Sequence, residues 1–471
     1  MKKNIYTLLS CLTLLCFTSC QKYLDIKPYG LTIPETPEEF SALLQTRLAD
    51  IEEGSDYVLL PKSSIVLDWE LYGDNFEPLL AGPRVTLPYY IGDKIESSTS
   101  VKTEYERLYE IIKDCNVIIG GMPDEDSDIA HNTLATAYAL RGISYYQLIR
   151  LYCEPVSAQP DQQLGVSIVT EFDMEAKAPR ATLTKSMQQA LSDLEKALSY
   201  NIQDNDYLFT ADVVKGYLAR AAFWFGKWDV ARKYAKEVIN KYPLLSGDSY
   251  RQMFEPGGKT GNTLIKVLYS ASSGEESIAL NQLRELPISN RFVSLFPEAE
   301  RSKDIRYTMS VGKKRMSTKQ IFSGMRSAEL LLIAAESAYH MGDESEALAL
   351  VNQLRENRIE DALPLTMATL PEENAYEIIK VNAKGATLTP LLSTILSERR
   401  KELFMEGDRF FELKRNGRPT FWIPKDGRRF TILPFMYTLP IPPKDLLLQK
   451  GLQQNPEYAK YTFGANNKPI Q

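Results

Sequence analysis

Arginine and glutamate side chains are closely spaced in residues 395–417, which read ILSERRKELFMEGDRFFELKRNG. Such a run could do two kinds of chemistry, since a pair of carboxylates can hydrolyse a glycosidic bond and opposite charges can pair inside a folded core. Glu398 lies three residues before Lys401, and Arg399 lies three before Glu402, so each pair can meet on neighbouring turns of a helix. Large aromatic residues are interleaved with these charges. We therefore expect a helix near the core whose charges are half-buried and paired.

Other residue types that commonly carry catalysis are scarce. The chain has two histidines, His131 and His340, and no CxxC pair, which argues against a His/Cys metal site and leaves few candidates for a histidine-activated nucleophile. Residues 257–260, GGKT, look like part of a phosphate-binding loop, but Met253 stands where that loop requires glycine. We therefore predict a binding protein with no catalytic residues, no metal and no cofactor.

Aromatic and polar residues that could bind a sugar lie early in the chain, in a Gly-, Pro-, Tyr- and Leu-rich segment without helical periodicity. Sugars present C–H faces that stack on aromatic rings and hydroxyls that meet carboxylates and amides, and Asp68, Trp69, Tyr72 and Asn75 offer both. We expect residues 55–93 to form a long surface segment that carries this ligand face. The alternative is that the two aromatic rings pack on the scaffold.

The ligand-face interpretation gives a specific expectation for Trp69. Its replacement by alanine should weaken glycan affinity about tenfold and leave the melting temperature nearly unchanged, because the segment imposes no core role on it.

Composition and charge exclude one class of partner. The chain is 44% apolar and 25% charged, as in ordinary globular proteins, and its net charge of -6 comes without a basic patch interleaved with aromatic residues. We therefore predict no nucleic-acid partner. Four Trp and 26 Tyr residues provide flat apolar surface for binding something else.

The N-terminus is typical of an exported lipoprotein. Residues 1–19 contain two lysines followed by an apolar run that is short for a membrane span, and they predict a signal peptide. Small residues precede Cys20, whose thiol would carry the lipid, although Phe17 stands where a lipobox usually has leucine. Acyl chains on Cys20 would anchor the protein without a transmembrane helix. The alternative is ordinary cleavage with Cys20 as a bystander.

Two cysteines remain beyond this segment, Cys115 and Cys153. We expect two buried thiols, with a disulfide as the alternative in an oxidising compartment.

Helical periodicity accounts for much of the remaining chain. We expect helices at residues 37–49, 105–119, 132–152 and 184–200, with Thr184 as the N-cap of the last. Two later stretches share one spacing of small and apolar residues, Ala219, Ala222, Gly226, Ala231, Ala235 and Val238 in the first and Ala335, Ala338, Gly342, Ala347, Val351 and Leu354 in the second. Each unit reads as a helix, a tight turn at glycine and a second helix, which is the tetratricopeptide-like pattern.

The predicted fold class is mostly α, a tetratricopeptide-like helix-pair scaffold with a loop-rich, partly β insertion. After the signal peptide at residues 1–19, we expect a single domain at 20–471, with insertions near 55–100 and 242–326. Residues 419–443 hold six prolines and should be mostly loop with a strand or two.

Several of these motifs resemble the SusD/RagB family of Bacteroidetes outer-membrane lipoproteins. The charged run carries the main resemblance, in Glu398, Arg399, Arg400, Glu402, Leu403, Glu406, Gly407, Arg409, Leu413, Arg415 and Gly417. The start of the mature chain, the Gly342 helix pair and the ending with Ile441-Pro442 and Gln454-Asn455-Pro456 are also similar. The resemblance covers nearly the whole mature chain and implies that the charged run is structural.

The resemblance also implies a function. It points to a protein held at the cell surface of the outer membrane by a lipid anchor, which binds an oligosaccharide and closes over a SusC-like TonB-dependent transporter. Family members often hold ligand with the early segment and with the later insertion, which adds Arg291 and Phe292 to the candidate ligand residues. Two alternatives stay open, a RagB-like peptide-binding role and a pure protein-interaction scaffold.

Overall fold

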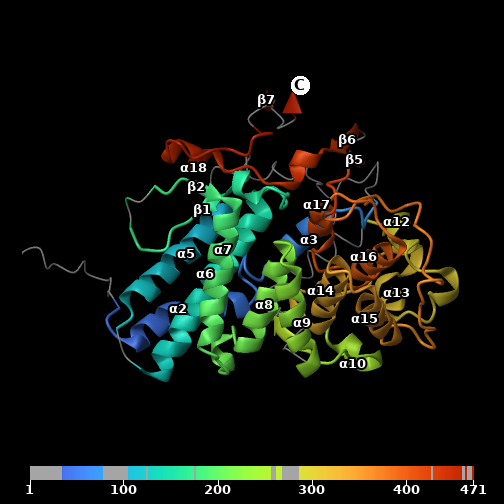
Figure 1. Ribbon diagram of the computed structural model, residues 1–471, viewed down its shortest axis with the longest axis horizontal. Helices are drawn as coiled ribbons and strands as arrows, with labels where there is room; N and C mark the ends of the chain where they lie inside the picture. The colour runs from blue at the N-terminus through green and yellow to red at the C-terminus, as the bar shows by residue number, and fades with distance from the viewer. Residues whose placement is uncertain are drawn as a thin grey trace, which may run out of the picture.

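The computed structural model describes most of the chain, and helices dominate it (Figure 1). The described residues are 34–77, 104–123, 126–173, 175, 177–255, 261–267, 286–425, 428–458, 462–463 and 469–470. The predicted signal peptide, Cys20 and residues 78–103 of the first predicted insertion lie outside these ranges. The mostly α prediction is confirmed.

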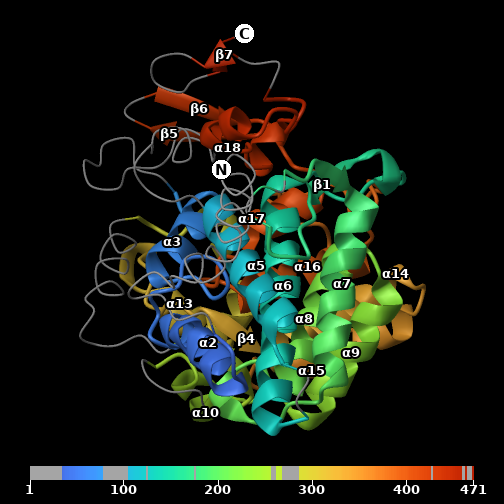
Figure 2. The same ribbon diagram turned by 90° about the vertical axis from the view of Figure 1, so that its left-hand side faces the viewer.

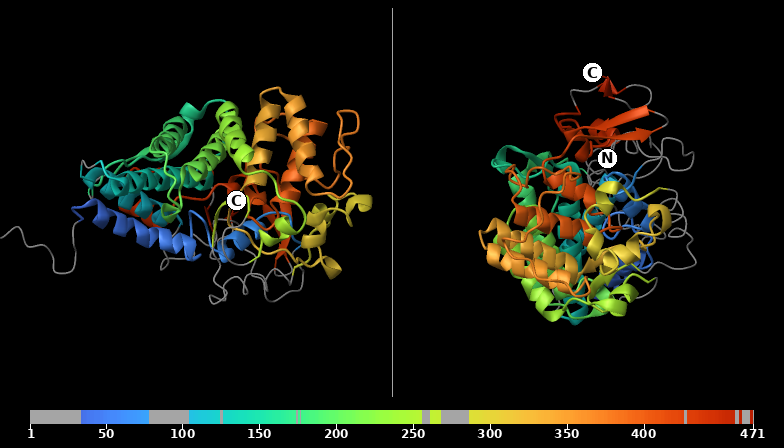
Figure 3. Two further views of the ribbon diagram at one scale, coloured as in Figure 1. Left: turned by 90° about the horizontal axis from the view of Figure 1, so that it is seen from below. Right: turned by 90° about the vertical axis from the view of Figure 1, so that its right-hand side faces the viewer.

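Long helices pack side by side in the order of the chain, and the row that they form is visible from two directions (Figures 1 and 3). The row consists of α5 (Glu104–Gly121), α6 (Asp128–Tyr152), α7 (Leu183–Ser199), α8 (Ala211–Trp224), α9 (Trp228–Lys241), α14 (Ser327–His340), α15 (Glu344–Glu356) and α16 (Pro390–Glu402). The first helix, α2 (Pro37–Glu52), packs on α6. The helices predicted at residues 37–49, 105–119, 132–152 and 184–200 therefore all form, with slightly different ends.

Shorter elements cover this row. The helices are α3 (Ser63–Leu71), α10 (Gly247–Gln252), α12 (Asn290–Val293), α13 (Ile305–Ser310), α17 (Arg409–Arg415) and α18 (Pro443–Leu448). Short 3-10 turns occur at η1 (Pro160–Gln162), η2 (Asn205–Tyr207), η3 (Glu298–Glu300), η4 (Lys313–Arg315) and η5 (Pro434–Tyr437). The antiparallel strand pairs are β1 (Leu164–Ser167) with β2 (Arg180–Thr182), β3 (Thr263–Lys266) with β4 (Gly324–Arg326), β5 (Phe421–Lys425) with β6 (Arg428–Ile432), and β7 (Thr462–Phe463) with β8 (Pro469–Ile470).

The strand pairs agree with two expectations. The β3 strand lies in the 242–326 insertion and pairs with β4 at its end, so this insertion is partly β as predicted. The β5–β6 hairpin is the strand pair expected in the proline-rich residues 419–443. This hairpin and α18 lie at the end of the molecule where the C-terminus is found (Figure 2).

Side-chain caps fix where several helices begin. Thr36 and Glu39 form a capping box at the start of α2, where Pro37 occupies the first turn. The start of α7 differs from the prediction, because Thr182 caps it by accepting the amide hydrogen of Lys185. Thr184 lies inside the helix instead.

The two repeat units have the predicted register. Gly226 and Gly342 end the first helix of each unit with φ of +70° and +85°, a conformation that favours glycine. Ala231 in α9 and Ala347 in α15 occupy matching positions, and both are fully buried. The small side chains let the two helices of each pair approach closely.

This register gives a test. Ala347→Leu should lower the free energy of unfolding by about 1–3 kcal/mol, because the larger side chain overpacks a closed helix crossing. Ala349 lies on the exposed side of the same helix, so Ala349→Leu is the matched control and should change stability little. Urea unfolding measures both. Equal midpoints for the two variants would mean that Ala347 does not face α14.

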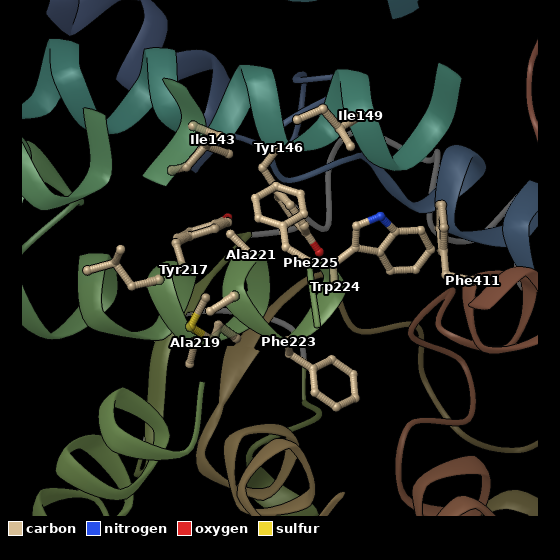
Figure 4. Close-up of a cluster of buried hydrophobic side chains, with 14 of the residues drawn as sticks. Ile143, Tyr146, Ile149, Tyr217, Ala219, Ala221, Phe223, Trp224, Phe225 and Phe411 are labelled. Carbon is tan, nitrogen blue, oxygen red and sulfur yellow. The ribbon is translucent and has the colours of Figure 1, made fainter. Parts of the chain in front are cut away.

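Aromatic side chains join the first half of the row to the C-terminal helices. Tyr146 of α6 lies against Phe225, and Trp224 of α8 meets Phe411 of α17 edge to face, with ring centroids 6.2 Å apart (Figure 4). The core is therefore continuous from α6 to α17, segments that are far apart in the sequence.

Residues 55–77 are not the extended surface segment that the sequence predicts. Ser63–Leu71 forms the helix α3, and Val66, Leu67 and Leu71 are buried against Phe76, Phe292 and Phe404. This helix has only nine residues, and although its buried positions share one face, two of the five, Ser63 and Glu70, are polar, which weakens the apolar pattern. A period-based prediction needs a longer window to detect such a helix.

Cys115 and Cys153 are free and buried, as expected, and burial raises the pKa of both thiols. Among the helices of the described ranges, none is both long enough and apolar enough to span a bilayer.

Candidate functional site

The charges of the signature run, residues 395–417, are buried at the junction of α16 and α17. Glu398 accepts hydrogen bonds from Lys401 at 2.8 Å and from Arg306 at 2.6 Å, so the predicted pairing with Lys401 is confirmed. The predicted pairing of Arg399 with Glu402 is wrong. Arg399 instead donates two hydrogen bonds to the carboxylate of Asp408, at 2.6 and 2.8 Å, in a bidentate pair. This pair forms because the chain turns back after α16.

Glu402 is the centre of one charge cluster. Its carboxylate accepts hydrogen bonds from Arg326 Nη1 at 2.6 Å and from Arg358 Nε at 2.9 Å, and all three side chains are almost completely buried. These contacts tie α16 to β4 and to the end of α15. Burial raises the pKa of Glu402, but the charges of Arg358 and Arg326 outweigh it and hold this pKa well below its usual value.

A second cluster ties the early chain to the signature run. Asp74 lies beside Arg400 at 3.1 Å and Arg409 at 2.7 Å, and Glu377 accepts hydrogen bonds from the same two arginines at 3.0 and 2.6 Å. Asn75 belongs to this cluster as well. Its amide nitrogen donates to Glu70 at 3.0 Å, and its oxygen accepts from Arg400 at 2.9 Å.

These carboxylates are poorly suited to glycoside hydrolysis. A general acid needs a raised pKa, whereas arginine neighbours hold the pKa values of Glu398 and Glu402 well below normal. Burial does raise the pKa of Glu412, to about 7, but this residue is 2% exposed and its carboxylate accepts a hydrogen bond from Arg409 Nη1 at 2.6 Å. The paired acids of the signature run therefore act as structural charges.

The structure places Trp69 and Tyr72 on the signature run. Trp69 is half-buried, and its ring stacks on Phe410 and contacts Phe411, with centroids 5.1 and 5.0 Å away. Tyr72 follows α3, is 8% exposed and meets Trp69 edge to face. Asp68 is half-buried on the same helix. These contacts favour the packing alternative for both rings.

The other three candidates lie at a junction between the early segment and the insertion. Ser289 donates its amide hydrogen to the carbonyl of Asn75 at 2.8 Å, so the two segments meet as expected from the resemblance. However, Asn75 and Phe292 are 1% and 0% exposed, while Arg291 is half-buried. The structure therefore brings the early and late segments together through core contacts.

A small hollow lies beneath Trp69. It has a volume of about 120 Å³ and is lined in part by Arg150, Trp224, Arg399 and Phe411. Ligand sites for drug-sized molecules span about 300–1,000 Å³. This hollow is too small for an oligosaccharide.

A larger cleft, which no sequence pattern predicted, lies beside α16. Its volume is about 500 Å³, and its walls are residues 294–300, residues 365–376 and the face of α16 that carries Ser393 and Ser397. Tyr376 stands at its edge with 61% of its surface exposed. No local pattern marks this tyrosine, because its exposure depends on how the loop before α16 is anchored.

Comparisons with known families agree with the fold and with the signature. Residues 301–458 match the SusD family, and residues 22–222 match a family described as starch-binding and associating with the outer membrane. The first match contains α16 and α17 with their buried charges, and the second contains α2 to α8 up to residue 222, including Asp74 and Asn75 of the second cluster.

Individual relatives are distant but similar over most of their length. SusD-like protein P2 of Formosa agariphila is 23% identical, covering 97% of this chain and 99% of the relative, and SusD-like protein P38 of the same organism is 24% identical, covering 69% and 73%. A crystal structure of a SusD-like carbohydrate binding protein from Bacteroides vulgatus has the same fold. Its TM-score is 0.64 at 20% identity, with 89% of this chain and 98% of that chain covered. The helix-pair row, the buried signature and the matches to both ends of the chain lead to one conclusion: this protein is a member of the SusD-like family.

Proposed function

We propose that this protein is a glycan-binding lipoprotein of the cell surface, which captures oligosaccharides for a SusC-like TonB-dependent transporter in the outer membrane. The observation that carries the proposal is the state of the signature carboxylates. They are buried and occupied by arginine and lysine side chains, so they hold the fold together and do not attack a bond. Binding is therefore the better class of function, and the carbohydrate-binding and starch-binding relatives support a glycan as the ligand.

Calorimetry with the purified mature chain tests the ligand class. We expect saturable binding to at least one member of a panel of soluble polysaccharides and oligosaccharides, with no release of smaller sugars on long incubation. A matched panel of peptides separates the RagB-like alternative. Binding to peptides alone would replace the glycan proposal, and binding to neither panel while the transporter is still bound would favour the protein-interaction scaffold.

Association with the transporter is tested by co-purification. We expect the SusC-like protein encoded in the same organism to co-purify with this chain from detergent-solubilised outer membranes. Glycan binding without any such complex would leave a surface glycan-binding protein and remove the transport role.

The lipid anchor rests on Cys20 and is tested separately. Cys20→Ala should release the protein from the outer membrane and abolish incorporation of labelled palmitate, because the acylated thiol is lost. Cell fractionation and labelling measure both effects, with Cys115→Ala as a control that leaves the anchor intact. A Cys20→Ala protein that still takes up palmitate and fractionates with the outer membrane would contradict the anchor.

A further inference from the structure

The cleft beside α16 has the dimensions and walls of a ligand site. Its volume of about 500 Å³ lies within the usual range for small-molecule sites. The long connection between α15 and α16, the orange loop at the right of Figure 1, supplies one wall, and α16 supplies another. All of the lining residues belong to the described ranges.

Tyr376 offers an open aromatic face at this cleft. Its side chain is 61% exposed, its ring has no aromatic or cationic partner among the described residues, and its hydroxyl makes no hydrogen bond there. Single exposed rings are common on protein surfaces, so it is the position of Tyr376 at a cleft that makes it a candidate for ligand contact. A pyranose ring stacks on such a face through its C–H groups.

The backbone around Tyr376 is held firmly. Asn374 accepts the amide hydrogen of Tyr376 at 2.9 Å and donates to Ser294 across the cleft at 3.1 Å. On the other side, Glu377 accepts the amide hydrogens of Ile378 and Ile379 and is clamped by the two arginines of the second charge cluster. The ring is thus presented on a preorganised loop, which reduces the entropy lost on binding.

Polar groups without partners face the same space. Ser393 and Ser397 lie four residues apart on one face of α16, and neither hydroxyl is hydrogen-bonded within the described chain. The two hydroxyls are therefore available to hydrogen-bond with a ligand that enters the cleft.

The charges of the cleft favour a neutral ligand. Its two cations are already neutralised, since Arg355 pairs with Glu300 at 2.9 Å and with Glu398 at 3.2 Å, and Lys401 pairs with Glu398 at 2.8 Å. Glu372 adds a further carboxylate to the lining. A uronate or sulfate group would therefore meet carboxylates with no spare cation.

We propose that this cleft binds a neutral oligosaccharide, with one sugar ring stacked on Tyr376 and the adjoining hydroxyls met by Ser393 and Ser397. The proposal rests on the glycan-binding function proposed above and assigns it a place in the fold. It locates the ligand away from Trp69, whose ring is used in packing.

The test compares three variants by calorimetry with the tightest neutral oligosaccharide from a panel of glucose, mannose, xylose and galactose polymers. Tyr376→Ala should weaken affinity about tenfold or more, because the stacking face is lost. Tyr376→Phe keeps the ring and should retain most of the affinity. Phe172→Ala, which removes another ring that is 52% exposed, is the matched control and should bind like the wild type.

A second experiment compares anionic with neutral glycans as ligands. Polygalacturonate and sulfated oligosaccharides of similar length should bind at least tenfold more weakly than the neutral ligand, at both low and high salt. Tighter binding of the anionic glycans would overturn the neutral-ligand assignment.

The possible failures are distinguishable. Unchanged affinity of a folded Tyr376→Ala protein would overturn the cleft assignment and leave the glycan-binding function standing. If the wild type binds no glycan of the panel, the proposed glycan-binding function and the cleft assignment are both wrong. Melting curves for all three variants confirm that any loss of binding is not a loss of fold.

Discussion

Glu402→Gln lowers the free energy of unfolding at pH 7 by about 3–5 kcal/mol, which is the usual cost of breaking a buried ion pair from one side. The substitution keeps the size of the side chain but removes the charge that faces Arg326 and Arg358, and both guanidinium groups are almost completely buried. Arg326 retains Glu406 at 2.6 Å, so the main loss falls on Arg358. Urea unfolding monitored by circular dichroism measures the difference.

The pH dependence of this difference follows from the lowered pKa of Glu402. A carboxylate with a lowered pKa in the folded state contributes stability above its unfolded pKa of 4.5, and this contribution is lost as the pH falls below that value. The difference in the free energy of unfolding between wild type and Glu402→Gln should therefore stay constant from pH 7 to about 5. Below pH 4.5 this difference should decrease by about 1.4 kcal/mol for each pH unit.

Glu298→Gln is the control for this experiment. Glu298 is exposed in the neighbouring η3 turn, and its replacement should leave stability within about 0.5 kcal/mol of the wild type. A Glu402→Gln protein as stable as Glu298→Gln would show that the cluster around Glu402 is open to water.

Trp69→Ala lowers the free energy of unfolding by about 2–4 kcal/mol, somewhat less than for a fully buried tryptophan. Trp69 packs between Tyr72 on its own segment and Phe410 and Phe411 of α17, so its removal leaves a gap beside the small hollow. This expected result differs from the one based on sequence alone, which was a loss of glycan affinity at nearly constant melting temperature. The contacts of the ring now favour the loss of stability.

Trp69→Phe separates packing from ligand contact. It keeps an aromatic ring and should cost less than about 1.5 kcal/mol. Denaturant midpoints and glycan affinity are measured on both variants. A Trp69→Ala protein with an unchanged midpoint and weakened glycan binding would restore the ligand-face interpretation.

The parts of the fold that the sequence predicted correctly are those set by local spacing. The positions of Ala231 and Ala347 follow from the repeat itself, because helix period and a glycine turn fix which side chains face the partner helix. Likewise, Glu398 and Lys401 pair because they share one helix face.

The errors arise where the tertiary fold overrides local spacing. Arg399 could reach Glu402 along the helix, but the turn after α16 places Asp408 beside Arg399, and these two side chains pair. Glu402 instead pairs with arginines from β4 and from the end of α15. Asn75 looked like a surface polar group because its partners Glu70 and Arg400 include a residue 325 positions away.

The candidate site was least predictable. Trp69 and Tyr376 are both aromatic residues in segments of mixed composition, and sequence reasoning chose the first. What distinguishes them is their surroundings, since Trp69 is covered by α17 whereas Tyr376 is held outward by the anchoring of Glu377. Neither condition leaves a local signal.

The cluster of Asp74, Glu377, Arg400 and Arg409 has a consequence for the order of folding. Asp74 pairs with Arg409, 335 positions away, and with Arg400, and without these two arginines its buried charge would lack both partners. The early segment therefore cannot close over its final neighbours until nearly the whole chain is available. We therefore expect a nascent chain that still lacks α16 and α17 to leave Asp74 and Asn75 without their native partners.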